Sequence, residues 1–238
     1  MVNFLLDADE TILDFVRSSE ESLAHTMRAF GLPYGKEMYT AYKRINDGLW
    51  REYERGEIDK KSLMRERFSR FFASLGIEAD PDAANAMYFE TLCRTGYLLA
   101  GADAFLHALK ERGRIFLVTN GTPAAQYGRL ASLGLESFFD GVYISDEIGY
   151  KKPDARFFGV LLQREGIERE DCLVIGDSLS SDIAGANNAK IACVWYAPAG
   201  AAAEGARPDF TAKTYEDILR IADAWAKEEM YKRSGKGE

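Results

Sequence analysis

The chain begins with a short apolar run, Val2 to Leu6, which ends directly at two carboxylates, Asp7 and Asp9. A run this short, without polar alternation, is typical of a buried strand in a parallel sheet. Open α/β sheets bind ligands beyond the carboxyl ends of their strands, so both acids are predicted to lie at the edge of a site. They would share one side of the extended chain, where two like charges are costly unless a cation or a proton separates them. The alternative is a strand that ends in an ordinary polar turn, where Asp is also favoured.

Between Phe15 and Leu98 the apolar residues recur at helical spacing in four successive segments. Glycine stops close the first three segments, and Asp80–Pro81 places a cap before a proline at the first position of the fourth. The sequence therefore predicts a helical block over residues 15–98. Its aromatic side chains, including Trp50, are predicted to form the core of a helical bundle rather than to line a ligand-binding site.

From Gly101 onward, β-rich runs alternate with helical patterns. The predicted strands cover Arg114–Val118, Val142–Ser145, Cys172–Ile175 and Ile191–Trp195, and a closing helix covers Tyr215–Met230. Such alternation implies right-handed crossovers and a parallel sheet with helices on both faces. We therefore expect an α/β core built from residues 1–14 and 99–238, with residues 15–98 inserted after the first strand. This insert would leave the sheet where Asp7 and Asp9 emerge, which is where a lid would be placed.

Composition and charge narrow the possible partners. The chain has 238 residues and a formal net charge of −8, which disfavours binding to nucleic acid polymers or anionic membranes. No signal peptide or membrane-length apolar stretch is present, so a cytoplasmic protein is expected. The three cysteines lack CxxC spacing, which argues against a disulfide or zinc framework. We expect a monomer or a weak homodimer.

Four polar clusters follow the predicted strands or their loops. They are Asp7/Asp9/Thr11, Thr119/Asn120, Lys151/Lys152 and Asp177/Asp182. A parallel sheet would gather such groups into one crevice. Several carboxylates offer the hard oxygens that Mg²⁺ prefers beside a substrate phosphate, and lysine with hydroxyl and amide donors suits phosphate oxygens. The simplest chemistry for this set is phosphoryl transfer through an aspartyl-phosphate.

The same clusters resemble the four motifs of the haloacid dehalogenase (HAD) superfamily. DADET at 7–11, VTNG at 118–121, KKPD at 151–154 and GDSLSSD at 176–182 occur in the right order and in the right strand context. The pattern spans Phe4 to about Ala186. The resemblance implies a Rossmann-like core with a helical cap of the C1 type, and a phosphatase that requires Mg²⁺.

By this resemblance, Asp7 would be the nucleophile that attacks phosphorus. Asp9 would protonate the leaving oxygen and then activate water for attack on the aspartyl-phosphate. The side chains of Asp7 and Asp177 and the backbone carbonyl of Asp9 would bind Mg²⁺, and Asp182 would support the metal from outside its ligand set. These roles would make the chain a phosphoric monoester hydrolase.

The resemblance also implies how the substrate phosphate is held. Thr119 and the Asn120 amide would bind the phosphoryl oxygens, and Lys152 would neutralise both Asp7 and the phosphate. Lys151 is then a solvated neighbour. Glu10 replaces the glycine that is commonest at its place in the superfamily, and DADET resembles the pyrimidine 5′-nucleotidase branch.

Several functions of this family stay open. The nucleotidase branch points to nucleoside 5′-monophosphates such as UMP, dUMP or dTMP, and the aromatic residues of the insert offer stacking partners. Those candidates are Tyr39, Tyr42, Trp50 and Tyr53. A sugar-phosphate phosphatase or a phosphomutase would share the aspartyl-phosphate. The halide-removing enzymes do not need an acid at Asp9, and a non-catalytic binding module would lack a nucleophile, acid or metal ligand that this chain has.

Overall fold

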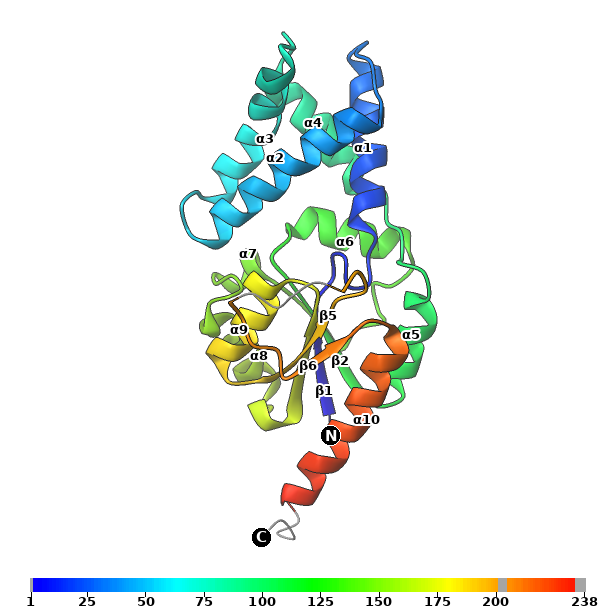
Figure 1. Ribbon diagram of the computed structural model, residues 1–238, viewed down its shortest axis with the longest axis vertical. Coiled ribbons are helices and arrows are strands. Elements are labelled where there is room, and N and C mark those ends of the chain that lie inside the picture. Colours follow the sequence, from blue (N-terminus) through cyan, green and yellow to red (C-terminus); the bar gives the residue numbers. More distant parts are fainter. Residues whose placement is uncertain (1, 201–204, 234–238) are drawn as a thin grey trace. The chain divides into compact units, whose positions relative to one another are not determined.

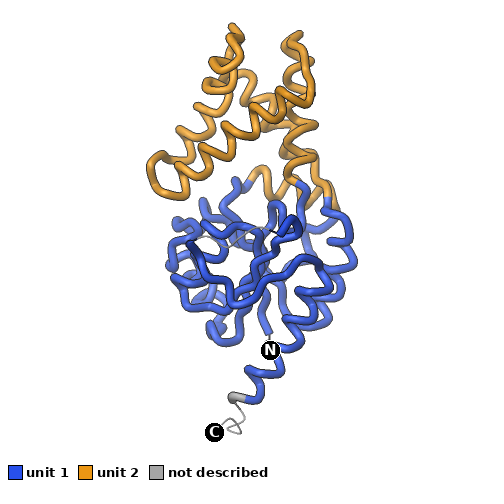
Figure 2. The backbone as a smooth tube through the Cα atoms, viewed as in Figure 1, with its two compact units in different colours: residues 1–14, 98–123, 134–238 blue, residues 15–97, 124–133 orange. Residues whose placement is uncertain are grey.

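The computed structural model describes residues 2–200 and 205–233. The chain divides into two compact units, drawn in different colours in Figure 2. The core unit consists of residues 1–14, 98–123 and 134–238, and the helical unit consists of residues 15–97 and 124–133. The helical unit therefore contains the predicted insert up to Tyr97 and adds a segment that the residue pattern did not assign to it. As a statement about domains, the division into 1–14 plus 99–238 and 15–98 stays a prediction.

The core unit is built on a parallel sheet of six strands in the order β3-β2-β1-β4-β5-β6. Its strands are β1 (Val2–Leu6), β2 (Gly113–Thr119), β3 (Gly141–Ile144), β4 (Cys172–Gly176), β5 (Ala192–Tyr196) and β6 (Phe210–Ala212). The predicted α/β class with a Rossmann-like parallel sheet is confirmed. The three-residue β6 was not predicted, because so short an edge strand carries no periodic pattern.

Helices cover both faces of this sheet (Figure 1). On one face α5 (Ala102–Lys110) packs against α10 (Tyr215–Arg233), and on the other α8 (Ala155–Glu165) packs against α9 (Ala184–Ala189). The remaining short elements are α7 (Ser145–Ile148), η1 (Arg169–Asp171) and the π-helical turn η2 (Leu179–Ile183). Because helices cover both faces of the sheet, its two central strands, β1 and β4, are shielded from solvent, and every residue of β4 is buried.

The helical unit contains α1 (Phe15–Ala29), α2 (Lys36–Glu54), α3 (Lys60–Leu75), α4 (Pro81–Leu92) and α6 (Pro123–Ser132). Side-chain caps begin two of these helices, since the Asp59 carboxylate accepts from Ser62 N and the Asp80 carboxylate accepts from Asp82 N. Aromatic side chains form its centre, where Phe68 packs within about 6 Å of four other rings. As predicted, the aromatic residues of this block largely form core.

Two glycines explain why α6 belongs to the helical unit. At Gly128 an added Cβ would lie 2.0 Å from the carbonyl oxygen of Cys93, and at Gly96 it would lie 2.6 Å from the carbonyl oxygen of Arg129. Only glycine permits backbones to approach this closely. In addition, the Ser132 hydroxyl accepts a hydrogen bond of 3.0 Å from Gly96 N.

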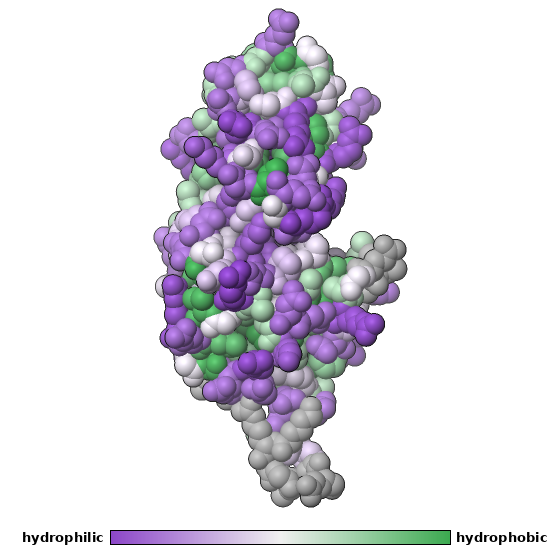
Figure 3. Space-filling view, turned by 90° about the vertical axis from the view of Figure 1, so that its left-hand side faces the viewer, coloured by the Kyte–Doolittle hydropathy of each residue, from purple (hydrophilic) through white to green (hydrophobic). Residues whose placement is uncertain are grey.

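The face drawn in Figure 3 is mostly hydrophilic, with apolar side chains in small patches. Among the described residues, no helix combines the length and the apolar character needed to cross a lipid bilayer.

Candidate active site

The register of the three central strands brings the predicted clusters to one edge of the sheet. Leu6 of β1 pairs with Leu117 of β2 and with Ile175 of β4, so Asp7 emerges beside Val118 and Gly176, close to the ends of β2 and β4. Asp7 N donates to the Ile175 carbonyl at 2.9 Å, which continues the sheet for one more residue. Asp7 is only 7% exposed.

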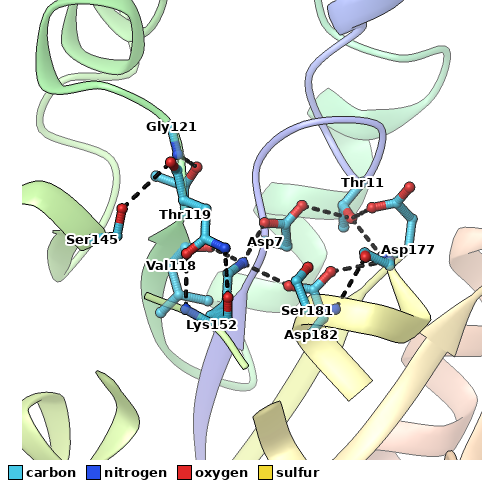
Figure 4. Close-up of polar contacts among 12 residues, drawn as sticks. Asp7, Thr11, Val118, Thr119, Gly121, Ser145, Lys152, Asp177, Ser181 and Asp182 are labelled. Carbon is cyan, nitrogen blue, oxygen red and sulfur yellow. Dashed lines mark hydrogen bonds and ion pairs between the residues drawn. The ribbon is translucent and has the colours of Figure 1, made fainter. Parts of the chain in front are cut away.

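Lys152 lies at the centre of this edge (Figure 4). Its Nζ is 2.6 Å from Asp7 Oδ1, 2.6 Å from Asp182 Oδ1 and 2.8 Å from the Val118 carbonyl. Three acceptors use the three donors of an ammonium group, so the side chain has one defined position. Lys152 is 1% exposed, and a charge buried this deeply requires such partners. Lys151 lies beside it, half-buried.

Asn120 fixes the loop that carries Lys152. Its side-chain Nδ2 donates to the Lys152 carbonyl at 2.8 Å, and its Oδ1 accepts from Lys152 N at 2.9 Å. The side-chain amide of Asn120 is therefore engaged by the backbone of Lys152. Thr119 Oγ1 accepts from Gly121 N at 3.0 Å, which shapes the turn after β2.

Thr11 lies between Asp7, the candidate nucleophile, and Asp177, which directly follows β4. Its Oγ1 is 3.3 Å from Asp7 Oδ2 and 3.5 Å from Asp177 Oδ1, and it accepts from Asp177 N at 3.1 Å. The Asp177 carbonyl accepts from Trp195 Nε1 at 2.8 Å. Asp177 is thus held at both its N–H and its carbonyl, which leaves its carboxylate directed into the site (Figure 4).

The carboxylates of Asp7, Asp177 and Asp182 form the acidic cluster. One oxygen of each lies within 4.8 Å of the others. Burial, and then the Asp182 charge, raise the pKa of Asp7 to about 7 even though Lys152 opposes the shift. Burial, followed by the charge of Asp7, also raises the pKa of Asp177 well above its usual range.

Both pKa shifts arise because negative charges are crowded together in a buried place, which is unfavourable. A divalent cation bound by hard carboxylate oxygens removes that cost, and the donor set therefore fits Mg²⁺. For Lys152, burial lowers the pKa but the charges of Asp182 and Asp7 raise it more, so its ammonium stays charged. Asp182 also accepts from Ser178 N at 3.1 Å, so it is held between Lys152 and the turn after β4.

Asp9 and Glu10 lie in the turn after β1, where both are half-buried. Glu10 adopts a left-handed backbone with φ of 59°, a conformation that glycine adopts freely and other residues rarely do. The turn is closed by backbone hydrogen bonds from Ile12 N and Leu13 N to the Ala8 carbonyl at 3.0 and 2.8 Å.

The structure brings Asp7, Lys152, Asp177 and Asp182 into direct contact or close approach, with Thr119 and Asn120 on the neighbouring strand end. Sequence reasoning missed the Val118 carbonyl and the Trp195 indole, and it did not show that the Thr11 hydroxyl lies between Asp7 and Asp177. Backbone acceptors carry no residue signal, and Trp195 follows Asp177 by too many positions for a local pattern.

The chain is similar to several known proteins. A family model of haloacid dehalogenase-like hydrolases matches residues 2–190. The chain belongs to this family of hydrolases. It is 36% identical over 222 residues to the pyrimidine 5′-nucleotidase PynA of Streptococcus pneumoniae, which covers 92% of the chain and 94% of PynA. It is 31% identical over 217 residues to the pyrimidine 5′-nucleotidase YjjG of Escherichia coli, which covers 90% of the chain and 95% of YjjG.

Two further relatives bear on metal and substrate. The crystal structure of the HAD-hydrolase YfnB from Bacillus subtilis, bound to magnesium, has a TM-score of 0.87 at 30% identity and covers 93% of the chain and 98% of YfnB. A glyceraldehyde 3-phosphate phosphatase of Pyrococcus abyssi is 31% identical over 199 residues, which covers 80% of the chain and 79% of that enzyme. The predicted family and the assignment as a hydrolase are confirmed.

The four aromatic residues named as stacking partners differ in exposure. Tyr42 has no exposed surface and contacts the rings of Phe68, Phe71 and Tyr88, so it cannot stack on a ligand. Tyr39 and Tyr53 are 7% and 8% exposed. Trp50 is half-buried and so keeps more exposed surface than the other three, although its ring packs edge-on against Tyr53.

Proposed function

We propose that this hydrolase cleaves phosphomonoesters with Mg²⁺, through an aspartyl-phosphate on Asp7, and that its substrates are small phosphorylated metabolites, pyrimidine nucleoside 5′-monophosphates first. The observation that carries the proposal is the position of Asp7. Its carboxylate is paired with a buried lysine and crowded by two other carboxylates, which is the environment of an anionic nucleophile that works beside a cation.

In the first half-reaction an Asp7 oxygen attacks phosphorus, and the bond between phosphorus and the ester oxygen breaks. Asp9, two residues further on in the turn, gives its proton to the departing oxygen. Lys152 keeps Asp7 oriented and offsets the charge that gathers on the phosphoryl oxygens, for which Thr119 and the Asn120 backbone are the neighbouring donors.

In the second half-reaction Asp9 takes a proton from water, whose oxygen attacks the phosphorus of the aspartyl-phosphate. The bond between phosphorus and Asp7 breaks, inorganic phosphate leaves, and both aspartates return to their starting states. Mg²⁺, held by Asp7, Asp177 and the Asp9 carbonyl with Asp182 behind them, would supply the positive charge that keeps the carboxylates ionised beside the phosphate.

The substrate class is supported by the likeness to PynA and YjjG over nearly their whole lengths and by Glu10 in DADET. Trp50 is our candidate for contact with a base, because the other aromatic candidates are buried. Stacking on an aromatic side chain contributes about 1–3 kcal/mol per base. Loss of Trp50 should therefore weaken binding of nucleotides more than binding of sugar phosphates.

A second candidate is a sugar-phosphate phosphatase, which the glyceraldehyde 3-phosphate phosphatase relative supports. The test is a panel of nucleoside 5′-monophosphates and sugar phosphates, with phosphate release measured in Mg²⁺ and in EDTA. Asp7→Asn is the control, since it keeps the shape of the side chain and removes its charge.

We expect phosphate release that requires Mg²⁺ and Asp7, with pyrimidine nucleotides preferred. A preference of tenfold or more for sugar phosphates would overturn the nucleotidase assignment and leave the phosphatase. An isomerised sugar phosphate in place of free phosphate would indicate a phosphomutase. Full activity of Asp7→Asn would overturn the mechanism.

A further inference from the structure

The first residue of the closing helix reaches the turn that carries the catalytic candidates. The Tyr215 hydroxyl donates a hydrogen bond of 2.9 Å to the carbonyl of Thr11, which lies 204 positions earlier in the chain. Burial raises the pKa of Tyr215 well above its ordinary value, so the hydroxyl stays protonated and able to donate.

The ring of Tyr215 is held by stacking on two other rings. Phe105 of α5 lies 4.5 Å away between ring centroids with an angle of 13°, and Tyr196 of β5 lies 5.1 Å away with an angle of 15°. Stacking on two partners restricts the ring, so the hydroxyl has a defined direction. The two stacking partners come from two separate elements of the core unit.

The hydrogen bond ends on the residue that links the acidic strand ends. Thr11 has no exposed surface, and its hydroxyl lies 3.3 Å from Asp7 Oδ2 and 3.5 Å from Asp177 Oδ1. The carbonyls of Ala8 and Leu13 accept from backbone N–H groups of the turn, whereas that of Thr11 accepts from Tyr215. Glu10, directly before Thr11, holds a left-handed conformation, so this turn depends on contacts from outside.

We propose that Tyr215 is a positioning residue of the active site: it holds the Thr11 carbonyl, and through it the Thr11 hydroxyl stays between Asp7 and Asp177. The catalytic part of this inference rests on the proposed function. The same contact also sets the separation of two carboxylates assigned to Mg²⁺, so it has a consequence for metal binding that can be measured without turnover.

The test replaces Tyr215 by phenylalanine, which keeps the stacked ring and removes the hydroxyl. The matched control is Tyr143→Phe, because the Tyr143 hydroxyl donates a hydrogen bond of 2.6 Å to Glu165 in the same unit. Mg²⁺ binding is measured by calorimetry, kcat and KM by phosphate release, and folding by thermal unfolding. We expect Tyr215→Phe to weaken Mg²⁺ binding and to lower kcat by about threefold to tenfold, the range for one hydrogen bond, with KM nearly unchanged. The Tyr143→Phe variant should keep the wild-type Mg²⁺ affinity, kcat and KM, although it also loses a hydrogen bond.

A double-mutant cycle shows whether Tyr215 acts through Thr11. In a Thr11→Val background the bridging hydroxyl is gone, so adding Tyr215→Phe should change Mg²⁺ affinity and kcat by less than about twofold. Equal losses in both backgrounds, or a Tyr215→Phe variant that binds Mg²⁺ like the wild type, would overturn the inference. If the wild type binds Mg²⁺ but releases no phosphate from any ester, the proposed function fails, and the Mg²⁺ titrations alone still decide the role of Tyr215.

Discussion

Without bound metal, the protein should become less stable as the pH rises from about 5 to about 8. The cause is Asp7, whose pKa is raised from 3.8 to about 7 in the folded chain by burial and by the charge of Asp182. Between these two values the folded state binds a proton that the unfolded state has already lost. The stabilising contribution of that proton is complete below pH 3.8 and is lost as the pH rises through about 7.

The size of the effect follows from the shift. Each pKa unit corresponds to about 1.4 kcal/mol, so the part of the shift between pH 5 and pH 7 removes about 3 kcal/mol from the free energy of unfolding. Asp177 acts in the same direction, because its pKa is also raised. Mg²⁺ should reverse the loss, since it binds the ionised carboxylates and stabilises the folded state by mass action.

Urea denaturation in EDTA at several pH values measures this contribution. The comparison is between the wild type and Asp7→Asn, whose neutral amide cannot titrate, so the difference between the two reports the Asp7 carboxyl together with its effect on Asp177. We expect the wild type to lose about 3 kcal/mol relative to Asp7→Asn between about pH 5 and pH 7, and to regain stability in Mg²⁺ more at pH 8 than at pH 5. A wild-type stability that is flat or rises relative to Asp7→Asn over this range would refute the reasoning.

Three further changes have defined outcomes. Asp9→Asn should slow hydrolysis of a nucleoside monophosphate by about 100- to 10,000-fold, as kcat will show, whereas phenol release in the first turnover of an aryl phosphate with a good leaving group should slow far less, as stopped-flow kinetics will show. Lys152→Met should leave Asp7 and Asp182 as unpaired buried charges and cost about 3–5 kcal/mol of unfolding free energy at pH 8, with a smaller loss at pH 5 where carboxyls take up protons, measured by urea denaturation. Phe68→Ala removes a fully buried ring from the helical unit and should cost about 3–5 kcal/mol in the same assay.

Much of the fold could be predicted from local patterns, because apolar spacing and helix caps specify a strand or helix within a few residues. The apolar run before Asp7 indicated β1, and Asp80 before Pro81 indicated the start of α4 at the observed residue. The clusters of the site could be predicted for a related reason. A parallel sheet brings its strand ends to one edge, so the order of the motifs along the chain was enough to bring Asp7, Lys152 and Asp177 together.

What the sequence could not reveal are contacts that depend on distant partners. The hydrogen bond from Tyr215 to Thr11 joins residues 204 positions apart. The side-chain amide of Asn120 donates a hydrogen bond to the backbone of Lys152, 32 positions later. Neither leaves a periodic pattern. The addition of α6 to the helical unit depends on the absence of a side chain at Gly128, and a glycine inside a helical pattern does not indicate what approaches it. Likewise, the sequence could not show that Phe68 of α3 and Tyr88 of α4 cover the ring of Tyr42.

The excess of negative charge in the site does not contribute to folding stability. One lysine faces three carboxylates, so two negative charges remain when all four groups are ionised. A buried ion pair gives little net stability even when it is balanced, and an excess of buried negative charge is unfavourable. The fold nevertheless holds these carboxylates in place with Lys152, Thr11, Ser178 N and the Trp195 indole. A divalent cation would offset the two remaining negative charges, and the site could then receive an anion such as a phosphate beside Lys152.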